Sequence, residues 1–87
     1  MSREEFEAAL LVLGFTKSEA PAGVWQWAHV PVGWAHIREC DEAESGFSVG
    51  VGCGLVGNWA AQIHYDPNDA LADIEAMCKH ICETLET

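Results

Sequence analysis

The stretch FSVGVGCG, residues 47–54, points to a β-sheet, because its apolar side chains alternate with serine or glycine. A period of two is typical of a strand with one buried face. The residues predicted to point inward are Phe47, Val49, Val51 and Cys53. Those on the opposite face are Ser48, Gly50, Gly52 and Gly54. Because that face is nearly bare backbone, it lets another element approach closely. A phosphate-binding glycine loop is not expected, since no helix pattern follows.

The same period recurs on both sides of this stretch. Residues 24–29 (VWQWAH) and 34–40 (WAHIREC) alternate before it, and residues 59–65 (WAAQIHY) alternate after it. Residues 16–23 have the composition of a loop. The segments between the strands are turns by composition: Pro31 with Gly33, the acidic residues 41–46, and Gly57 with Asn58.

Two amphipathic helices bracket these strands. The first is predicted over residues 2–13, where Ser2 and Glu5 form a capping box and Gly14 ends the helix. The second is predicted over residues 66–86, with Asp66 as the N-cap and Pro67 in the favoured first position. The expected apolar stripe of the first helix is Phe6, Leu10 and Leu13. That of the second helix is Leu71, Ile74, Cys78, Ile81 and Leu85.

The order of elements is therefore α-β-β-β-β-α. This order predicts an α+β fold, in which an antiparallel sheet of three to four strands carries the N-terminal and C-terminal helices on one face. Eighty-seven residues suffice for one small core, so residues 1–87 are expected to form a single domain.

The charge of the chain excludes several classes of function. Fourteen Asp and Glu oppose four Lys and Arg, which leaves a net charge of −10. Direct nucleic-acid binding and attachment to an anionic membrane both require clustered positive charge, so neither is expected. No apolar run approaches the about 20 residues that span a bilayer. Because the N-terminus also lacks the layout of a signal peptide, a cytoplasmic location is expected.

The four cysteines are expected to be reduced thiols, because nothing in the sequence marks export. Cys78 and Cys82 have helical i, i+4 spacing, but a structural zinc site needs four ligands and no second close pair supplies them. His29 and His36 could approach Cys40 from neighbouring strands, yet no nucleophile signature surrounds this cysteine. The sequence therefore predicts no metal, no other cofactor and no enzymatic activity.

Four tryptophans are many for a chain of this length. A small core holds two or three such rings, and tryptophan is enriched at interface hot spots. Trp25 and Trp27 share one strand face and are the candidate interface aromatics. The sheet face without helices must be polar, covered or paired with a second copy. A small dimeric structural or assembly protein, bound through an aromatic sheet face, is therefore the alternative function.

The acidic residues carry the leading hypothesis. They concentrate in a turn and at helix starts, and uncompensated carboxylates of this kind serve either solubility or a basic partner. The residues predicted to contact a partner are Glu39, Asp41, Glu42, Glu44, Asp66, Asp69 and Asp73.

In size and charge the chain resembles small acidic inhibitors: nuclease immunity proteins, antitoxins, and phage anti-CRISPR or anti-restriction proteins. The resemblance implies a non-enzymatic protein with a basic partner, such as a nuclease or a CRISPR-type complex. Its mechanism would be steric and electrostatic blockade of a groove that otherwise holds phosphates.

Overall fold

The computed structural model describes residues 1–19, 22–29, 32–54 and 61–86. Within those residues the elements are, in chain order, α1 (Arg3–Val12), β1 (Phe15–Lys17), β2 (Val24–Trp27), β3 (Gly33–Glu39), β4 (Phe47–Cys53), β5 (Gln62–His64) and α2 (Pro67–Glu86). The strand expected at 59–65 is present only over Gln62–His64, as β5, since residues 61 and 65 lie outside it. Trp59, the turn at Gly57 and Asn58, and Pro31 lie outside the described residues.

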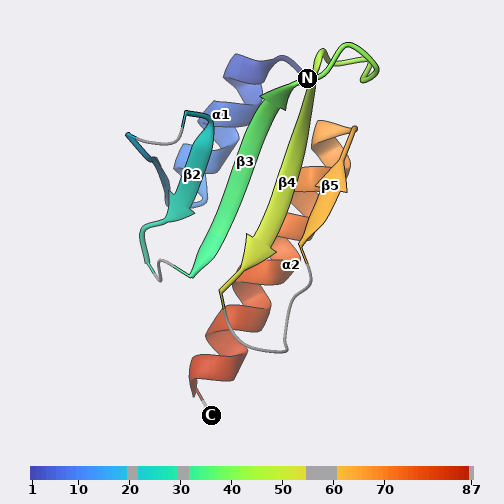
Figure 1. Cartoon of the computed structure of the whole chain (residues 1–87). Helices are drawn as coiled ribbons and strands as arrows, with labels where there is room; N and C mark the ends of the chain where they lie inside the picture. The colour runs from blue at the N-terminus through green and yellow to red at the C-terminus, as the bar shows by residue number, and fades with distance from the viewer. Residues whose placement is uncertain (20–21, 30–31, 55–60, 87) are drawn as a thin grey trace.

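The strands form one antiparallel sheet in the order β1-β2-β3-β4-β5, so each strand pairs with its neighbours in sequence (Figure 1). The central pair, β3 with β4, runs over seven residues from Gly33 opposite Cys53 to Glu39 opposite Phe47. The predicted α+β class, with an antiparallel sheet and both helices on one face, is confirmed. The number of strands is corrected from three or four to five.

The extra strand is β1, which lies in the stretch expected to be a loop. It has three residues and pairs Phe15 with Trp27 and Lys17 with Trp25. A strand this short shows no clear period of two, and loop-like residues follow it. Gly14 directs the chain into the sheet, because its φ of +95° ends α1 and favours glycine. The Gly14 carbonyl then accepts a hydrogen bond from the Ala28 amide at 2.9 Å.

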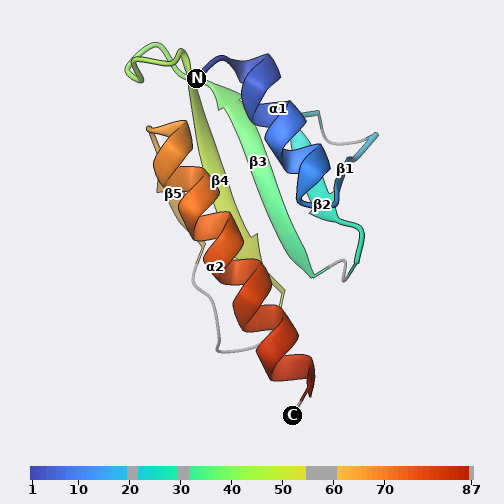
Figure 2. The ribbon, with the colours of Figure 1, turned by 180° about the vertical axis from the view of Figure 1, so that it is seen from behind.

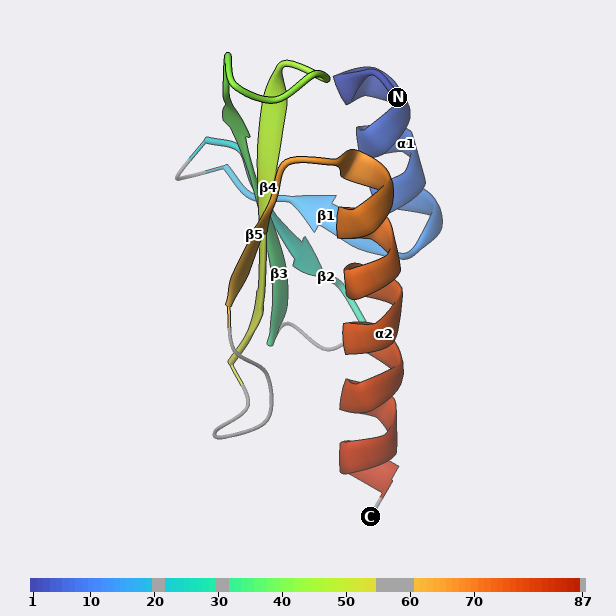
Figure 3. The same ribbon diagram turned by 90° about the vertical axis from the view of Figure 1, so that its right-hand side faces the viewer.

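Both helices cover the same face of the sheet, as the views from behind and from the side show (Figures 2 and 3). The core lies between these two layers, and the rings of Phe6 on α1 and Phe47 on β4 meet there with centroids 5.7 Å apart. Val49 and Val51 point into this core as predicted, and Cys53 packs half-buried against it. Burial of each large apolar side chain stabilises the fold by about 1.5–3 kcal/mol.

The predicted cap of each helix is present. In α1 the Ser2 hydroxyl accepts from the Glu5 amide and the Ser2 amide donates to Glu5 Oε1, both at 3.1 Å, which confirms the capping box. At the start of α2 the Asn68 amide donates to Asp66 Oδ1 at 2.8 Å. The Ala70 amide donates to the Asp66 carbonyl at 3.0 Å, which closes the first turn. Local sequence therefore defines where both helices begin.

The buried stripe of α2 differs from the predicted one. Its fully buried residues are Ala70, Ile74, Met77 and Ile81. Leu71 and Cys78 are half-buried beside this stripe, and Leu85 is 56% exposed. The prediction weighted the most apolar side chains, whereas the sheet selects the face that includes the small Ala70 and the flexible Met77. Leu85 is exposed because α2 continues past the end of β4 (Figures 1 and 3).

Candidate functional site

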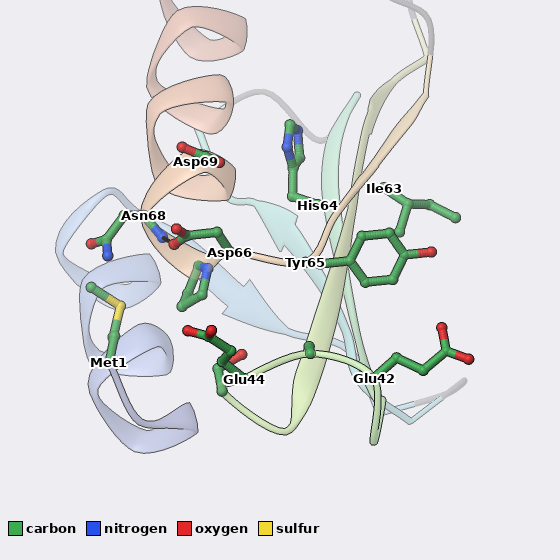
Figure 4. Close-up of a pocket in the computed structure, with 12 residues that line it drawn as sticks. Met1, Glu42, Glu44, Ile63, His64, Tyr65, Asp66, Asn68 and Asp69 are labelled. Carbon is green, nitrogen blue, oxygen red and sulfur yellow. Dashed lines mark hydrogen bonds between the residues drawn. The ribbon is translucent and has the colours of Figure 1, made fainter.

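A cavity of about 780 Å³ lies between the turn that joins β3 to β4 and the start of α2 (Figure 4). Its walls come from residues 42–45, residues 63–69 and Met1. These segments are brought together because β5 runs antiparallel to β4 and leads directly into α2. The cavity therefore joins two acidic parts of the chain that are separated in sequence by β4 and β5.

Four of the predicted contact residues line this cavity: Glu42, Glu44, Asp66 and Asp69. All four are exposed, and none of the described residues that line the cavity is a lysine or an arginine. In Figure 4, Glu44 and Asp66 lie on the side where α2 begins, and Glu42 points to the other side, where Ile63 and Tyr65 lie. The carboxylates thus surround the cavity and create a negative potential there.

The turn holds its carboxylates outward through its own backbone hydrogen bonds. The Cys40 amide donates to the Gly46 carbonyl at 3.0 Å, and the Gly46 amide donates to the Ala43 carbonyl at 3.0 Å. Gly46 has a φ of +84°, which glycine adopts without strain. Ala43 is buried between two exposed glutamates, so it anchors the turn while Glu42 and Glu44 face solvent.

The start of α2 favours negative charge. Asp66 caps the helix and Asp69 lies in its first turn. Carboxylates at this position interact favourably with the exposed amides and the dipole of the helix, by about 0.3–1 kcal/mol each. This local stabilisation offsets part of the repulsion between carboxylates that approach from the turn.

Asp73 does not belong to the exposed group, which corrects the predicted stripe along Asp66, Asp69 and Asp73. Its Oδ2 lies 2.7 Å from His64 Nε2 on β5, and the two side chains are only 13% and 18% exposed. The contact joins the edge strand β5 to α2. Helical spacing places the three aspartates along one side of α2, but it could not show that β5 would pack against Asp73.

The remaining predicted contact residues lie elsewhere. Glu39 is exposed at the end of β3 and lines a second groove, on the sheet face away from the helices. Asp41 is exposed in the turn but does not line the acidic cavity. Sequence reasoning did not select Ile63 and Tyr65, which line both the acidic cavity and the second groove. Their alternation within residues 59–65 was the available signal, because it places them on one strand face.

The candidate interface aromatics are also corrected, because Trp25 and Trp27 are core residues, 3% and 7% exposed. They share the sheet face that the helices cover, and Trp27 Nε1 donates to the Leu13 carbonyl at 3.0 Å. Of the tryptophans that the structure describes, Trp34 lies on the other face, where its indole lies across the backbone of β4. A Cβ at Gly52 would overlap Trp34 Cζ2, so the predicted close approach to the glycine face is confirmed.

The thiols and histidines are the other candidate ligands and nucleophiles that the sequence offers. No group there of three or more His, Cys, Asp or Glu is arranged to hold a metal ion. Burial, together with the neighbouring Cys82, raises the pKa of the Cys78 thiol to about 11. A protonated thiol is a poor nucleophile and metal ligand. His36 Nδ1 accepts from Arg38 Nε at 3.3 Å and His29 packs on the Trp27 ring, so neither contact involves Cys40.

Two further observations bear on function. Within the described ranges, neither helix combines the length and the apolar character that crossing a membrane requires. Comparison of the chain with protein-family models, with curated proteins and with solved structures gave no match.

Proposed function

We propose that this chain is a small, acidic, non-enzymatic protein that binds a basic nucleic-acid-handling protein in the cytoplasm and blocks its nucleic-acid groove. The observation that supports this most directly is the convergence of Glu42 and Glu44 with Asp66 and Asp69 around one cavity. A nuclease or a CRISPR-type complex is the kind of partner that such a surface fits.

The electrostatic reason lies in what a nucleic-acid groove offers. Proteins that hold nucleic acid line the groove with Lys and Arg, which neutralise phosphates. A fixed group of carboxylates attracts the same cations, accelerates association and occupies the same space. The net charge of −10 extends this attraction beyond the cavity itself.

The backbone supports such a role because it holds the carboxylates in place before binding. Hydrogen bonds within the turn and the cap at Asp66 fix the two chain segments. An ordered surface loses less conformational entropy on association than a flexible acidic tail does.

The test uses two variants that each remove four negative charges. The cavity variant carries Glu42→Gln, Glu44→Gln, Asp66→Asn and Asp69→Asn, and asparagine preserves the helix cap. The control variant carries Glu4→Gln, Glu19→Gln, Glu75→Gln and Glu83→Gln, at exposed positions that do not line the cavity. The wild-type chain first captures proteins from a host-type lysate at low and high salt, and mass spectrometry identifies them.

The captured protein is then purified, and each chain competes with labelled nucleic acid for it. We expect the wild-type chain and the control variant to displace the nucleic acid, and the cavity variant to be weaker by about tenfold or more. Equal weakening of both variants would mean that only net charge matters. A captured protein that keeps its nucleic acid in the presence of the chain would contradict blockade.

A further inference from the structure

The open face of the sheet, defined by the strand residues that point away from the helices, differs in charge from the rest of the molecule. Of the described strand residues that point away from the helices by alternation, none is an aspartate or glutamate, in a chain that has fourteen. Two glutamates, Glu39 at the end of β3 and Glu42 in the turn, line the groove at one end of this face. Its largest or most polar members are Gln26, Trp34, His36, Arg38, Ser48 and Ile63, and the others are threonine, valine and glycine. Most of the carboxylates therefore lie away from this surface.

The open face also carries exposed apolar side chains around a groove of about 440 Å³. Ile63 is 63% exposed and Tyr65 is 56% exposed, and together with Trp34 they line the groove beside Gly50. In Figure 4 these two side chains point away from His64, which faces α2. Contiguous apolar side chains on an exposed groove mark a surface of contact.

We infer that a second copy of this chain docks on the open face, so that two sheets pack face to face about a two-fold axis. This approach opposes few carboxylates, those of Glu39 and Glu42 at one end of the groove, whereas most other approaches of two chains with a charge of −10 oppose like charges. In a two-fold contact the same patch serves both copies, so it must be complementary to itself.

The charges at one end of the groove meet that requirement. Arg38, Glu39 and Glu42 line the same groove. Among the described residues Arg38 forms no ion pair, and its Nε donates to His36. A two-fold axis that passes between Arg38 and these glutamates would place Arg38 of each copy opposite a glutamate of the other. A basic partner would instead meet Arg38, which favours a second copy as the occupant of this face.

The size of the face predicts a weak dimer. Strands about 4.8 Å apart that rise about 3.3 Å per residue give roughly 400 Å² of flat sheet per copy. Two copies bury roughly 800 Å² before side chains and the 40–46 turn are counted, which is below the about 1,200 Å² of stable specific interfaces and in the range of weak, transient ones. A dissociation constant in the micromolar range is therefore expected.

Sedimentation velocity of the purified chain, from low micromolar to near-millimolar concentration, tests this inference without any partner. We expect the mass to rise from one copy to two, and the dimer to tighten at high salt because salt screens the repulsion between copies. The proposed binding of a basic partner weakens with salt, so the two interactions have opposite signatures. A single copy at every concentration and salt would overturn the inference.

Two matched variants locate the interface. Ile63→Lys places a cation on the open face, and Val12→Lys makes the same change on α1, where Val12 is 87% exposed. We expect Ile63→Lys to weaken the dimer by about tenfold or more, and Val12→Lys to leave it unchanged. Far-UV circular dichroism checks that both fold. Equal dimer constants for the two variants would overturn the assignment, as would an Ile63→Lys chain that still dimerises and loses only its basic partner.

Discussion

The helix-covered face and the open face belong to the same strands, but helices pack on one face and the side chain of Trp34 packs on the glycines of the other. On the covered face β4 presents Val49 and Val51, which are buried against the helices. On the open face the same strand presents Gly50 and Gly52, and the Trp34 indole lies on that bare backbone. Alternation decides which residues share a face, and the helices decide which face becomes the core.

The two faces are expected to differ most in how much an isoleucine-to-alanine substitution lowers the free energy of unfolding. Ile74→Ala opens a cavity beneath α2, where Ile74 is fully buried, and should lower the free energy of unfolding by about 2–5 kcal/mol. Ile63→Ala removes the same atoms from an exposed position and should cost about 0.5 kcal/mol or less. Chemical denaturation at concentrations where the chain is monomeric measures both. Similar costs would show that the open face is packed as a core.

A second pair of variants tests how Trp34 packs on the glycines. Gly52→Ala places a Cβ in the space of the indole and should destabilise the chain by about 1–3 kcal/mol, since the rigid ring must move. Gly50→Ala is the control, because its Cβ would lie 3.7 Å from Trp34 Cζ3, an ordinary contact. When Trp34→Ala is already present, the cost of Gly52→Ala should disappear. A cost that persists in the double variant would contradict this packing.

The two core tryptophans sharpen the description of the covered face. Trp27→Phe loses the hydrogen bond to the Leu13 carbonyl, whereas the buried Trp25 Nε1 has no hydrogen-bond partner to lose. Because both changes remove similar apolar area, Trp27→Phe should cost about 1 kcal/mol more than Trp25→Phe. Urea unfolding of the two variants gives this difference directly. Equal costs would mean that the Leu13 contact adds no net stability.

The smallest effect is expected at the cap of α1, the shorter helix on the covered face. Ser2→Ala removes the capping box and should cost about 0.5–1 kcal/mol. Thermal unfolding measures the loss. If Ser2→Ala proved as stable as the wild type, the capping box would contribute nothing to holding α1.

The same cap predicts a pH dependence. Hydrogen bonds from the Ser2 amide and hydroxyl lower the pKa of Glu5 below its ordinary value. The unfolded chain therefore binds this proton more readily, so the stability that Glu5 provides is present at neutral pH and is lost as pH falls through its folded pKa. Thermal unfolding from neutral to acidic pH should show a smaller loss for Glu5→Gln than for wild type. An identical acid dependence would contradict the cause given for this shift.

Much of this fold could be predicted from local patterns. The strand at residues 47–53, both helix starts and the placement of the helices on one face follow from period, caps and order of elements. β1 could not be predicted, because three residues carry too little periodicity. The burial of Trp25 and Trp27 depends on which face the helices cover, and no single strand contains that information.

The sequence predicted which acidic residues belong to the candidate site, but not how these residues are arranged in space. Acidic groups at residues 41–46 and at the start of α2 are visible in the sequence, and four of those residues meet at one cavity. Sequence alone could not exclude Asp73, because its contact with His64 depends on how β5 packs against α2. The sequence also did not single out Ile63 and Tyr65, because their role depends on lying between the acidic cavity and the groove on the open face, both of which they line.

In the proposed function the acidic cavity, and not the net charge alone, docks the basic partner. The most direct measurement is the association rate constant of the captured protein with the wild-type chain, the cavity variant and the control variant, each across a series of salt concentrations. We predict that the cavity variant associates about tenfold more slowly and with a shallower salt dependence, while the control variant stays close to wild type. Identical rates and salt slopes for the two variants would contradict the claim.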